Sequence, residues 1–401
     1  MSDERREVVV VGAGPAGSAT AALLARRGVD VLLLDAACFP RDKVCGEGVS
    51  PEAWRLLELT GAADAVRRLR PQPLRGMHLV SPDGTSIRGS YPAGRSGFAL
   101  RRRALDEALV DTARAAGAEV REGVRVVQPA QEGGAVVGVV CAPGDGRERV
   151  VRARAVVAAD GRRSVIARGL GLLREHRRLR RFAVRGYWDG VAGLDAFGEM
   201  HVGSGGYCGI APLAAGQANV TFVLDASEMA RAAGDLDGFY RASLAGCWPR
   251  VAERLQEATL CEPPRAIGPL ALVCRAVAVP GAVLVGDAAG FYDPFTGEGV
   301  TLALRSAELA TEALLPALRS GRSTVGRLRE YERARRRATR DKFRFNRLLQ
   351  LAVRRPTLAN AIARRLARRP ELADRLVGIA GDFVPARTAL GPGFLLRLLL
   401  A

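Results

Sequence analysis

Residues Val8–Gly17 read Val-Val-Val-Val-Gly-Ala-Gly-Pro-Ala-Gly. Four successive valines predict a buried parallel strand, and the Gly-x-Gly-x-x-Gly pattern predicts a tight turn into a helix. Gly12 permits the turn, Gly14 lets the backbone approach a phosphate, and Gly17 lets the helix pack closely on the strand. A helix N-terminus attracts anions through its free N–H groups and its dipole. The stretch therefore predicts a Rossmann-type unit that binds a pyrophosphate.

The residues after this turn supply the context that the motif needs, since the glycines alone would also fit a surface turn. A helix from Pro15 to about Arg27 leads to a second apolar strand, Val31–Leu34. Asp35 ends that strand about twenty residues beyond the glycines, where a carboxylate accepts hydrogen bonds from a ribose. We therefore expect a dinucleotide site.

Composition limits the class of protein. The chain has 401 residues, 48% of them hydrophobic, which is enough for a large core in two domains. We expect neither a membrane span nor a signal peptide, because no apolar run is long enough. The seven scattered cysteines show no Cys-x-x-Cys pair, which favours reduced thiols in the cytoplasm. Three dispersed histidines, His78, His176 and His201, are too few for a metal site, so no metal is expected.

The net charge of +18 comes almost entirely from arginine, because the only lysines are Lys43 and Lys342. Much of it lies in residues 321–401, where helices carry arginines beside apolar positions and residues 394–400 form an apolar tail. Such helices are compatible with peripheral contact to an anionic membrane, a cap over a substrate cavity, a dimer contact or a solvated face. Nucleic acid is not an expected partner, because no aromatic stacking platform accompanies the arginines. The apolar positions are Leu348, Leu349, Leu351, Ala352, Leu366, Leu372 and Leu376.

The strand and helix patterns predict an α/β fold, α+β overall. A Rossmann-type domain carries an inserted, mostly antiparallel sheet and a helical C-terminal extension. Helix breaks are expected at Gly321, Pro356 and Pro370. The expected regions are a nucleotide-binding domain (1–75, 97–170 and 270–320), a substrate-binding domain (76–96 and 171–269) and a basic helical C-terminal region (321–401).

Four separated stretches resemble, in their order, the FAD-dependent oxidoreductases of the aromatic-hydroxylase (glutathione-reductase-like) fold. They are the glycine turn with Asp35, an arginine at a helix start, Asp160-Gly161 at a strand end, and residues 285–300, which contain Val-Gly-Asp and Gly-Glu-Gly-Val. The resemblance covers residues 7 to about 315. It implies that Asp287 binds the ribityl chain and that Arg102, between Arg101 and Arg103, lies over the pyrophosphate.

The same resemblance implies that the helix start at Gly297–Val300 presents backbone N–H groups to the flavin. A helix N-terminus there would stabilise the anion of reduced flavin. The implied FAD contacts, together with the glycine turn, are Gly12, Gly14, Ala16, Gly17, Asp35, Cys45, Gly46, Gly48, Arg102, Val126, Asp160, Gly286, Asp287, Gly297, Gly299 and Val300.

A narrower resemblance rests on residues 40–48, Pro-Arg-Asp-Lys-Val-Cys-Gly-Glu-Gly, and on residues 293–299, Asp-Pro-Phe-Thr-Gly-Glu-Gly. Both segments are similar to those of geranylgeranyl reductases, which bind FAD and saturate isoprenoid double bonds. The resemblance places Cys45 beside the isoalloxazine ring, where it supplies a proton or only packs on the ring. Lys43 would pair with a phosphate or polarise a substrate.

The chain departs from that branch at residues 207–212, Tyr-Cys-Gly-Ile-Ala-Pro. Geranylgeranyl reductases carry Tyr-x-Trp-x-Phe-Pro there, and flavin halogenases carry Trp-x-Trp-x-Ile-Pro. Tyr207, a third candidate catalytic residue, and Pro212 are kept, but glycine and alanine replace both bulky residues. The cavity beside the flavin is therefore expected to be wider, and a halogenase is not expected.

Three functions are compatible with these motifs. The first, which we favour, is an FAD-dependent reductase of C=C bonds in a hydrophobic, isoprenoid or polyketide-like substrate. The second is an FAD-dependent monooxygenase of an aromatic or polyketide-like compound. The third, a non-catalytic lipid carrier, is the weakest because every FAD segment is kept. No second Gly-x-Gly-x-x-Gly is present, so NAD(P)H would donate electrons transiently, or a separate reductase would.

Overall fold

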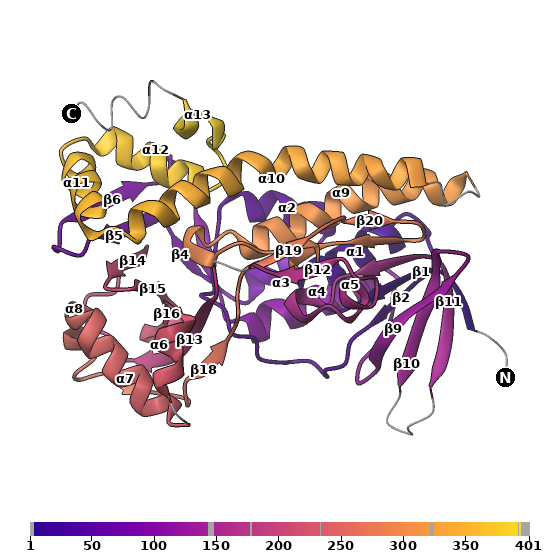
Figure 1. Ribbon diagram of the computed structural model, residues 1–401, viewed down its shortest axis with the longest axis horizontal. Coiled ribbons are helices and arrows are strands. Elements are labelled where there is room, and N and C mark those ends of the chain that lie inside the picture. Colours follow the sequence, from indigo (N-terminus) through magenta and orange to yellow (C-terminus); the bar gives the residue numbers. More distant parts are fainter. Residues whose placement is uncertain are drawn as a thin grey trace.

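The computed structural model describes residues 4–142, 148–176, 179–232, 234–320, 325–391 and 393. It is elongated, with a mainly parallel sheet toward one end and a mainly antiparallel sheet toward the other (Figure 1). The expected α/β fold with two sheets and C-terminal helices is confirmed. The apolar tail at 394–400 and the break expected at Gly321 lie outside the described residues.

The first sheet has the order β20-β21-β11-β1-β2-β8, and β10 and β9 extend it from β11. β1 runs parallel to β2 and to β11, so that Val8 pairs with Val31 and with Ala155. The four valines and the apolar run Val31–Leu34 form the predicted buried strands. The bounds are β1 Glu4–Val11, β2 Val31–Leu34, β8 Glu119–Arg121, β9 Arg125–Glu132, β10 Ala135–Ala142, β11 Arg149–Ala158, β20 Ala278–Val279 and β21 Ala282–Leu284.

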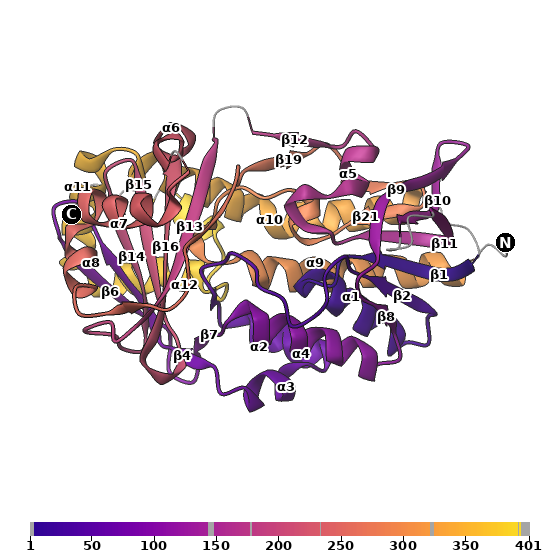
Figure 2. The ribbon, with the colours of Figure 1, turned by 90° about the horizontal axis from the view of Figure 1, so that it is seen from below.

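Helices cover this sheet (Figure 2). The first, α1, begins at Pro15, as predicted, but ends at Ala25, and it packs against α4 and α9. The helices of this half are α1 Pro15–Ala25, α2 Glu52–Thr60, α3 Ala63–Arg68, α4 Arg102–Ala115, α5 Val165–Gly169 and α9 Gly299–Arg319. Two short 3-10 turns, η4 Gly286–Ala289 and η5 Pro294–Thr296, precede α9.

The second sheet has the order β17-β13-β16-β15-β14-β5-β6, with β18 beside β13. Its pairs are antiparallel except β14 with β5, where Phe197 pairs in parallel with Gly76. Helices α6 Ala226–Met229, α7 Leu236–Cys247 and α8 Pro249–Arg254 belong to this half. The strands are β5 Gly76–Val80, β6 Ser86–Ser90, β13 Arg181–Asp189, β14 Phe197–Gly203, β15 Gly206–Pro212, β16 Gln217–Asp225, β17 Thr259–Leu260 and β18 Arg265–Ile267.

Two small sheets lie outside these two. One has the order β3-β7-β4 (Gly48–Val49, Gly97–Ala99 and Gln72–Leu74), and the other pairs β12 Leu173–Glu175 with β19 Leu272–Cys274.

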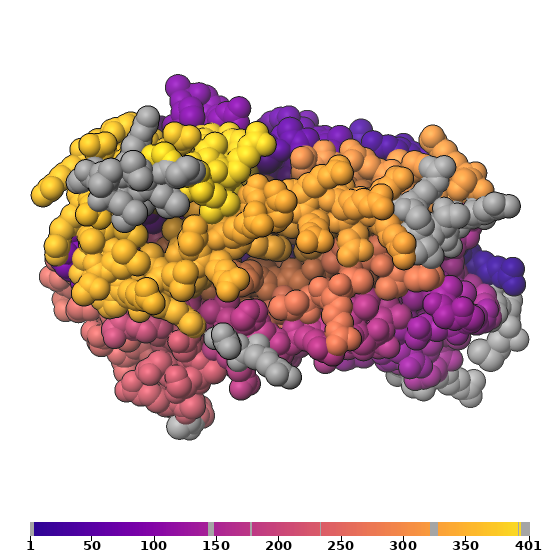
Figure 3. Space-filling view, turned by 45° about the horizontal axis from the view of Figure 1, so that its top comes forward, coloured from indigo at the N-terminus to yellow at the C-terminus, as the bar shows by residue number. Residues whose placement is uncertain are grey.

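The C-terminal region is helical, with the predicted breaks before Pro356 and Pro370. Its helices are α10 Val325–Val353, α11 Pro356–Ala367, α12 Pro370–Ala380 and α13 Arg387–Leu390. The long α10 packs on α9 and β20, while α11 and α12 contact β6 at the other end. In Figure 3 these orange and yellow segments spread across one face of the molecule. Within the described residues, no helix is both long enough and apolar enough to cross a membrane.

Candidate active site

A cavity of about 740 Å³ lies between the two sheets. It extends from the glycine turn, past residues 41–50 and 286–300, to the C-terminal helices. All the predicted site residues except Gly17 line it: Gly12, Gly14, Ala16, Asp35, Lys43, Cys45, Gly46, Gly48, Arg102, Val126, Asp160, Tyr207, Gly286, Asp287, Gly297, Gly299 and Val300.

The glycine turn forms a cradle at one end of the cavity. Gly12 has a φ of 97°, and a Cβ atom there would lie 2.5 Å from the carbonyl oxygen of Ala159. Gly17 does not line the cavity, because it packs on the turn itself: its Cβ would lie 1.8 Å from the Gly12 oxygen. The first turn of α1 has no side-chain cap and no acidic residue. Its N–H groups are therefore available to an anion such as a pyrophosphate.

Asp35 lies at the end of β2 beside this cradle. Its carboxylate accepts hydrogen bonds from the backbone N–H groups of Ala13 (2.6 Å) and Ala37 (2.8 Å). The side chain thus fixes the glycine turn to β2 and also borders the cavity. A carboxylate has more acceptor sites than these two bonds use, so its predicted ribose contact is compatible with this geometry.

Arg102 is the arginine of its cluster that faces the site. Its Nε and Nη2 both donate to Asp106, at 2.8 Å each, and Arg41 pairs with the same carboxylate at 3.2 Å. Burial lowers the pKa of Arg102, but the Asp106 carboxylate and Cys45 outweigh burial, so the pKa is raised. Arg101 instead donates to Glu262 at 2.8 Å. Sequence analysis missed Asp106, although it lies four residues after Arg102 on the same helix face.

Two carboxylates and a lysine follow along the cavity. Asp160 accepts from the Val165 N–H at 2.7 Å, while its other oxygen is buried without a partner, and burial raises its pKa. The pKa of Lys43 is lowered, because burial has a larger effect than the nearby Asp287 carboxylate, which acts in the opposite direction. Arg162 is a further cation that lowers the pKa of Lys43. Lys43 and Arg162 bring positive charge to this part of the cavity, which suits a pyrophosphate.

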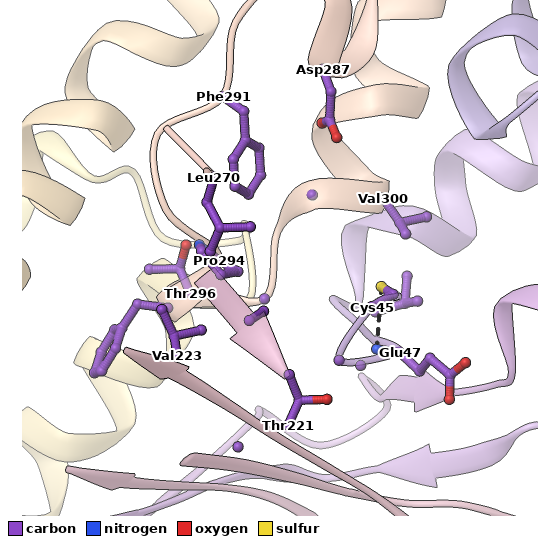
Figure 4. A pocket seen from close by; sticks show the side chains of 18 of the residues that line it. Cys45, Glu47, Thr221, Val223, Leu270, Asp287, Phe291, Pro294, Thr296 and Val300 are labelled. Carbon is purple, nitrogen blue, oxygen red and sulfur yellow. Dashed lines mark hydrogen bonds between the residues drawn. The ribbon is translucent and has the colours of Figure 1, made fainter. Parts of the chain in front are cut away.

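Cys45 and Asp287 border one open space together with Leu270, Phe291 and Val300 (Figure 4). The Glu47 N–H donates to Cys45 Sγ at 3.3 Å. The start of α9, at Gly299, borders the same space. The predicted thiol, carboxylate and helix start therefore meet around one volume.

Glu47 is a buried acid that sequence analysis overlooked. It has a φ of 61° and is 1% exposed. It accepts from the Arg102 N–H at 2.9 Å, from Asn219 Nδ2 at 3.2 Å and from the Tyr187 hydroxyl. Burial raises its pKa despite these donors. Glu47 thus ties the Cys45 loop to the antiparallel sheet. In the sequence, only its place between Gly46 and Gly48 indicated that it belongs to the site.

Tyr207 presents its ring to the cavity, but its hydroxyl points elsewhere. The hydroxyl donates to Asp293 at 2.6 Å, and the ring packs edge-to-face on Phe295 with centroids 4.9 Å apart. Burial and the Asp293 carboxylate raise the pKa of Tyr207 well above its usual range. A catalytic role for Tyr207 stays a prediction, since this hydroxyl is already committed to a neighbour.

The far end of the cavity is apolar and comes mostly from elements distant in sequence. Leu79 and Ile87 on β5 and β6 face it, and so do Gly209 and Ala211, the small residues of β15. The C-terminal helices complete the wall with Phe345, Leu349, Ala352, Val353, Ala359, Ile362, Ala363, Leu366, Leu376, Val377 and Ala380. The sequence left a membrane contact, a dimer contact, a solvated face and a cap over the cavity open for these helices. In the structure they cover the cavity.

The match to a family model identifies the chain. A model described as an FAD binding domain matches residues 5–346. The chain belongs to this FAD-binding family. The glycine cradle that a Cβ would fill, the unpaired buried oxygen of Asp160 and the cationic lining all fit FAD.

Two similar proteins indicate the branch of the FAD-binding family to which this chain belongs. The chain is 33% identical over 330 residues to a menaquinone reductase of Mycolicibacterium smegmatis, covering 77% of this chain and 76% of that protein. It is 32% identical over 341 residues to a digeranylgeranylglycerophospholipid reductase of Methanosarcina mazei, covering 82% and 80%. The protein is therefore an FAD-dependent oxidoreductase of the geranylgeranyl reductase branch, as the motifs at 40–48 and 293–299 predicted.

Several solved structures share the fold of this chain. A flavoprotein/dehydrogenase from Cytophaga hutchinsonii superposes with a TM-score of 0.83 at 23% identity, covering 95% of this chain and 93% of that one. A geranylgeranyl bacteriochlorophyll reductase-like protein from Thermoplasma acidophilum gives 0.75 at 22%, covering 99% and 96%. The flavin-dependent halogenase CmlS gives 0.81 at 23%, covering 97% and 77%. At these identities the likeness shows the fold alone.

Proposed function

We propose that this protein uses FAD to reduce C=C bonds in a long hydrophobic substrate of isoprenoid type. The observation that carries the proposal is the shape of its cavity. A polar end with the glycine cradle is continuous with an apolar end walled by strands β5, β6, β14 and β15 and by the three helices α10, α11 and α12. A flat aromatic substrate would not need an apolar wall that extends into α11 and α12. The named relatives, a menaquinone reductase and a lipid reductase, support the same substrate class.

The chain's own residues would divide the work along this cavity. The turn at Gly12–Ala16, with Arg41 and Arg102, would hold the pyrophosphate, and Asp287 and the start of α9 would hold the flavin. Bound FAD, once reduced, supplies the hydride. Cys45 would hold a proton at Sγ on the substrate side, and the apolar wall would exclude water and align the chain of the substrate.

An anaerobic reaction tests the proposal. The holoprotein is reduced with one equivalent of dithionite under argon and then mixed with a digeranylgeranyl lipid in detergent, because this lipid has no quinone ring that could accept the hydride instead of a C=C bond. We expect the flavin to reoxidise and the substrate to gain two hydrogen atoms by mass spectrometry. Flavin that reoxidises only with oxygen, together with a product that gains an oxygen atom, would establish the monooxygenase instead.

A substitution tests the role of Cys45. Cys45→Ser keeps a small polar side chain among the expected FAD contacts, so the variant should still bind FAD, but anaerobic substrate reduction should fall about a hundredfold, the size of a typical general-acid contribution. Absorbance of bound flavin checks the first expectation, and single-turnover reoxidation checks the second. Unchanged single-turnover rates would remove Cys45 from the mechanism and leave it as a packing residue.

Three finer parts of the proposal concern the surroundings of the enzyme. We propose NAD(P)H or a separate reductase as the electron donor, and a cytoplasmic location, which is supported by seven cysteines that are all free. We also propose peripheral membrane contact through α10, where the exposed Leu348 and Leu351 lie among arginines. Flotation with vesicles of anionic or of zwitterionic lipid tests this contact, and binding to neither would remove it.

A further inference from the structure

The long helix α10 carries polar residues beside the apolar residues that line the cavity. Three polar side chains, Lys342, Asn346 and Gln350, recur every four residues and therefore share one face of the helix. We call them the α10 polar face. The apolar residues Phe345 and Leu349, which line the cavity, occupy the neighbouring stripe. One helix thus carries two stripes with different surroundings.

The α10 polar face contacts the loop that leads into α9, residues 293–299. Gln350 Nε2 donates to Asp293 Oδ1 at 2.8 Å, and Asn346 Nδ2 donates to the Asp293 carbonyl at 3.1 Å. Lys342 Nζ lies 3.6 Å from the Glu298 carboxylate and also pairs with Asp382. Gln350 accepts in turn from Arg181. Both ends of the loop are therefore held from α10.

Tyr207 and Arg181 hold Asp293 from the side of the antiparallel sheet, and the α10 contacts hold the loop from the opposite side, where it is not packed solidly. Beside these direct contacts, a cavity of about 40 Å³ lies between part of the loop and α10, bordered by Thr296, Glu298, Gly299, Lys342 and Asn346. Between α10 and this loop, hydrogen bonds therefore take the place of close packing. Asn346, Gln350 and Asp293 are all buried, and buried hydrogen bonds are costly to leave unmade.

We propose that the α10 polar face positions the loop 293–299, and with it the N-terminus of α9, against the flavin. Lys342, Asn346 and Gln350 are positioning residues, since they act through Asp293 and Glu298. The cavity face of the same loop carries Gly297 and Gly299, which are among the predicted FAD contacts. The proposal depends on FAD binding, which the family establishes, and not on the identity of the substrate.

Substitution of Gln350 tests the proposal with readouts that need no substrate. Gln350→Met keeps the length of the side chain but removes its hydrogen bonds to Asp293 and Arg181. We expect the Kd for FAD to rise about tenfold, the equivalent of one or two lost hydrogen bonds. We also expect the absorbance bands of the bound flavin to shift. Titration of FAD-free protein by flavin fluorescence and a spectrum of the holoprotein measure both.

A matched control lies one position along the same helix. Leu351 is 48% exposed, so Leu351→Gln should change neither the Kd nor the spectrum. A folded Gln350→Met protein with an unchanged Kd and spectrum overturns the proposal. The same is true if its thermal unfolding midpoint falls equally with and without FAD, because that describes a purely structural role.

A second pair of variants covers the case in which Gln350→Met does not fold. Lys342 has 20% of its side chain accessible and pairs with two buried carboxylates, Glu298 and Asp382. Lys342→Met should raise the Kd for FAD severalfold, and Lys342→Arg should restore it by keeping a cation beside Glu298. Equal Kd values for the wild type and both variants would overturn the proposal.

Discussion

The two ends of the cavity are built in opposite ways. The polar end is formed largely by short continuous stretches, namely residues 8–17, 41–48 and 286–300, and by backbone groups that a glycine exposes. The apolar end takes single side chains from β5, β6, β14, β15 and three C-terminal helices. A cofactor of fixed shape is held by a fixed backbone, whereas a substrate is selected by side chains that differ between relatives. Substitutions at the two ends should therefore have separable effects.

The largest expected effect comes from overfilling the cradle. A Cβ at Gly17 would overlap the Gly12 oxygen at 1.8 Å, so Gly17→Val must displace the turn that holds the pyrophosphate. We expect FAD affinity to fall about a hundredfold, the upper end of the ~1–3 kcal/mol that overpacking costs. The FAD retained on purification and a fluorescence titration measure this loss.

Gly246→Ala is the control for Gly17→Val. Gly246 lies near the end of α7, and its added methyl group would meet no atom within 4 Å. It should leave FAD binding unchanged. Normal FAD binding by Gly17→Val would show that the cradle does not depend on this close packing.

A smaller effect, confined to the substrate, is expected at the apolar end. A Cβ at Gly209 would meet its nearest atoms at 3.7 Å, an ordinary contact distance, so a larger side chain fits the strand and enters the cavity. Gly209→Leu should raise KM for a long-chain substrate about tenfold, as a few methylene groups do in a hydrophobic pocket, and Gly209→Ala should do so only slightly. Steady-state kinetics measure KM, and flavin titration should show an unchanged Kd. A weakened FAD affinity in Gly209→Leu would contradict the separation of the two ends.

A weaker effect is a dependence of stability on pH at Glu47, which ties the Cys45 loop of the polar end to strands β13 and β16 of the antiparallel sheet. Its pKa in the folded protein is raised above the ordinary 4.5. The folded state therefore binds this proton more tightly than the unfolded state, which stabilises the fold at low pH. That stabilisation is lost as the pH rises from about 4.5 through the raised pKa.

Glu47→Gln removes this titration and keeps the shape of the side chain. We expect the thermal midpoint of the wild type, measured relative to that of Glu47→Gln, to fall as the pH rises above 4.5. Parallel pH profiles for the two proteins would show that Glu47 does not titrate in this range.

The residues of the polar end were largely predictable because their signals are local. Strand, turn and helix at residues 8–25 follow from a short pattern, and Asp35 from its spacing to the glycines. Arg102 was separable from Arg101 only in the structure, since both stand at the start of α4 and burial next to Asp106 distinguishes them. Glu47 was missed because its partners Tyr187 and Asn219 lie more than a hundred residues away.

The Rossmann-type unit, its glycine turn and the branch of the family followed from the sequence, because these depend on backbone conformation and on contiguous motifs. The small residues at 207–212 also indicated a wider cavity. That the C-terminal helices line this cavity became clear only from the fold. Their amphipathic pattern was equally compatible with a membrane contact, a dimer contact or a cap over the cavity. Such a pattern indicates that one face of a helix is buried, but it does not indicate what covers that face. The contacts across the cavity place Leu349 and Leu366 in its wall and Gln350 on Asp293.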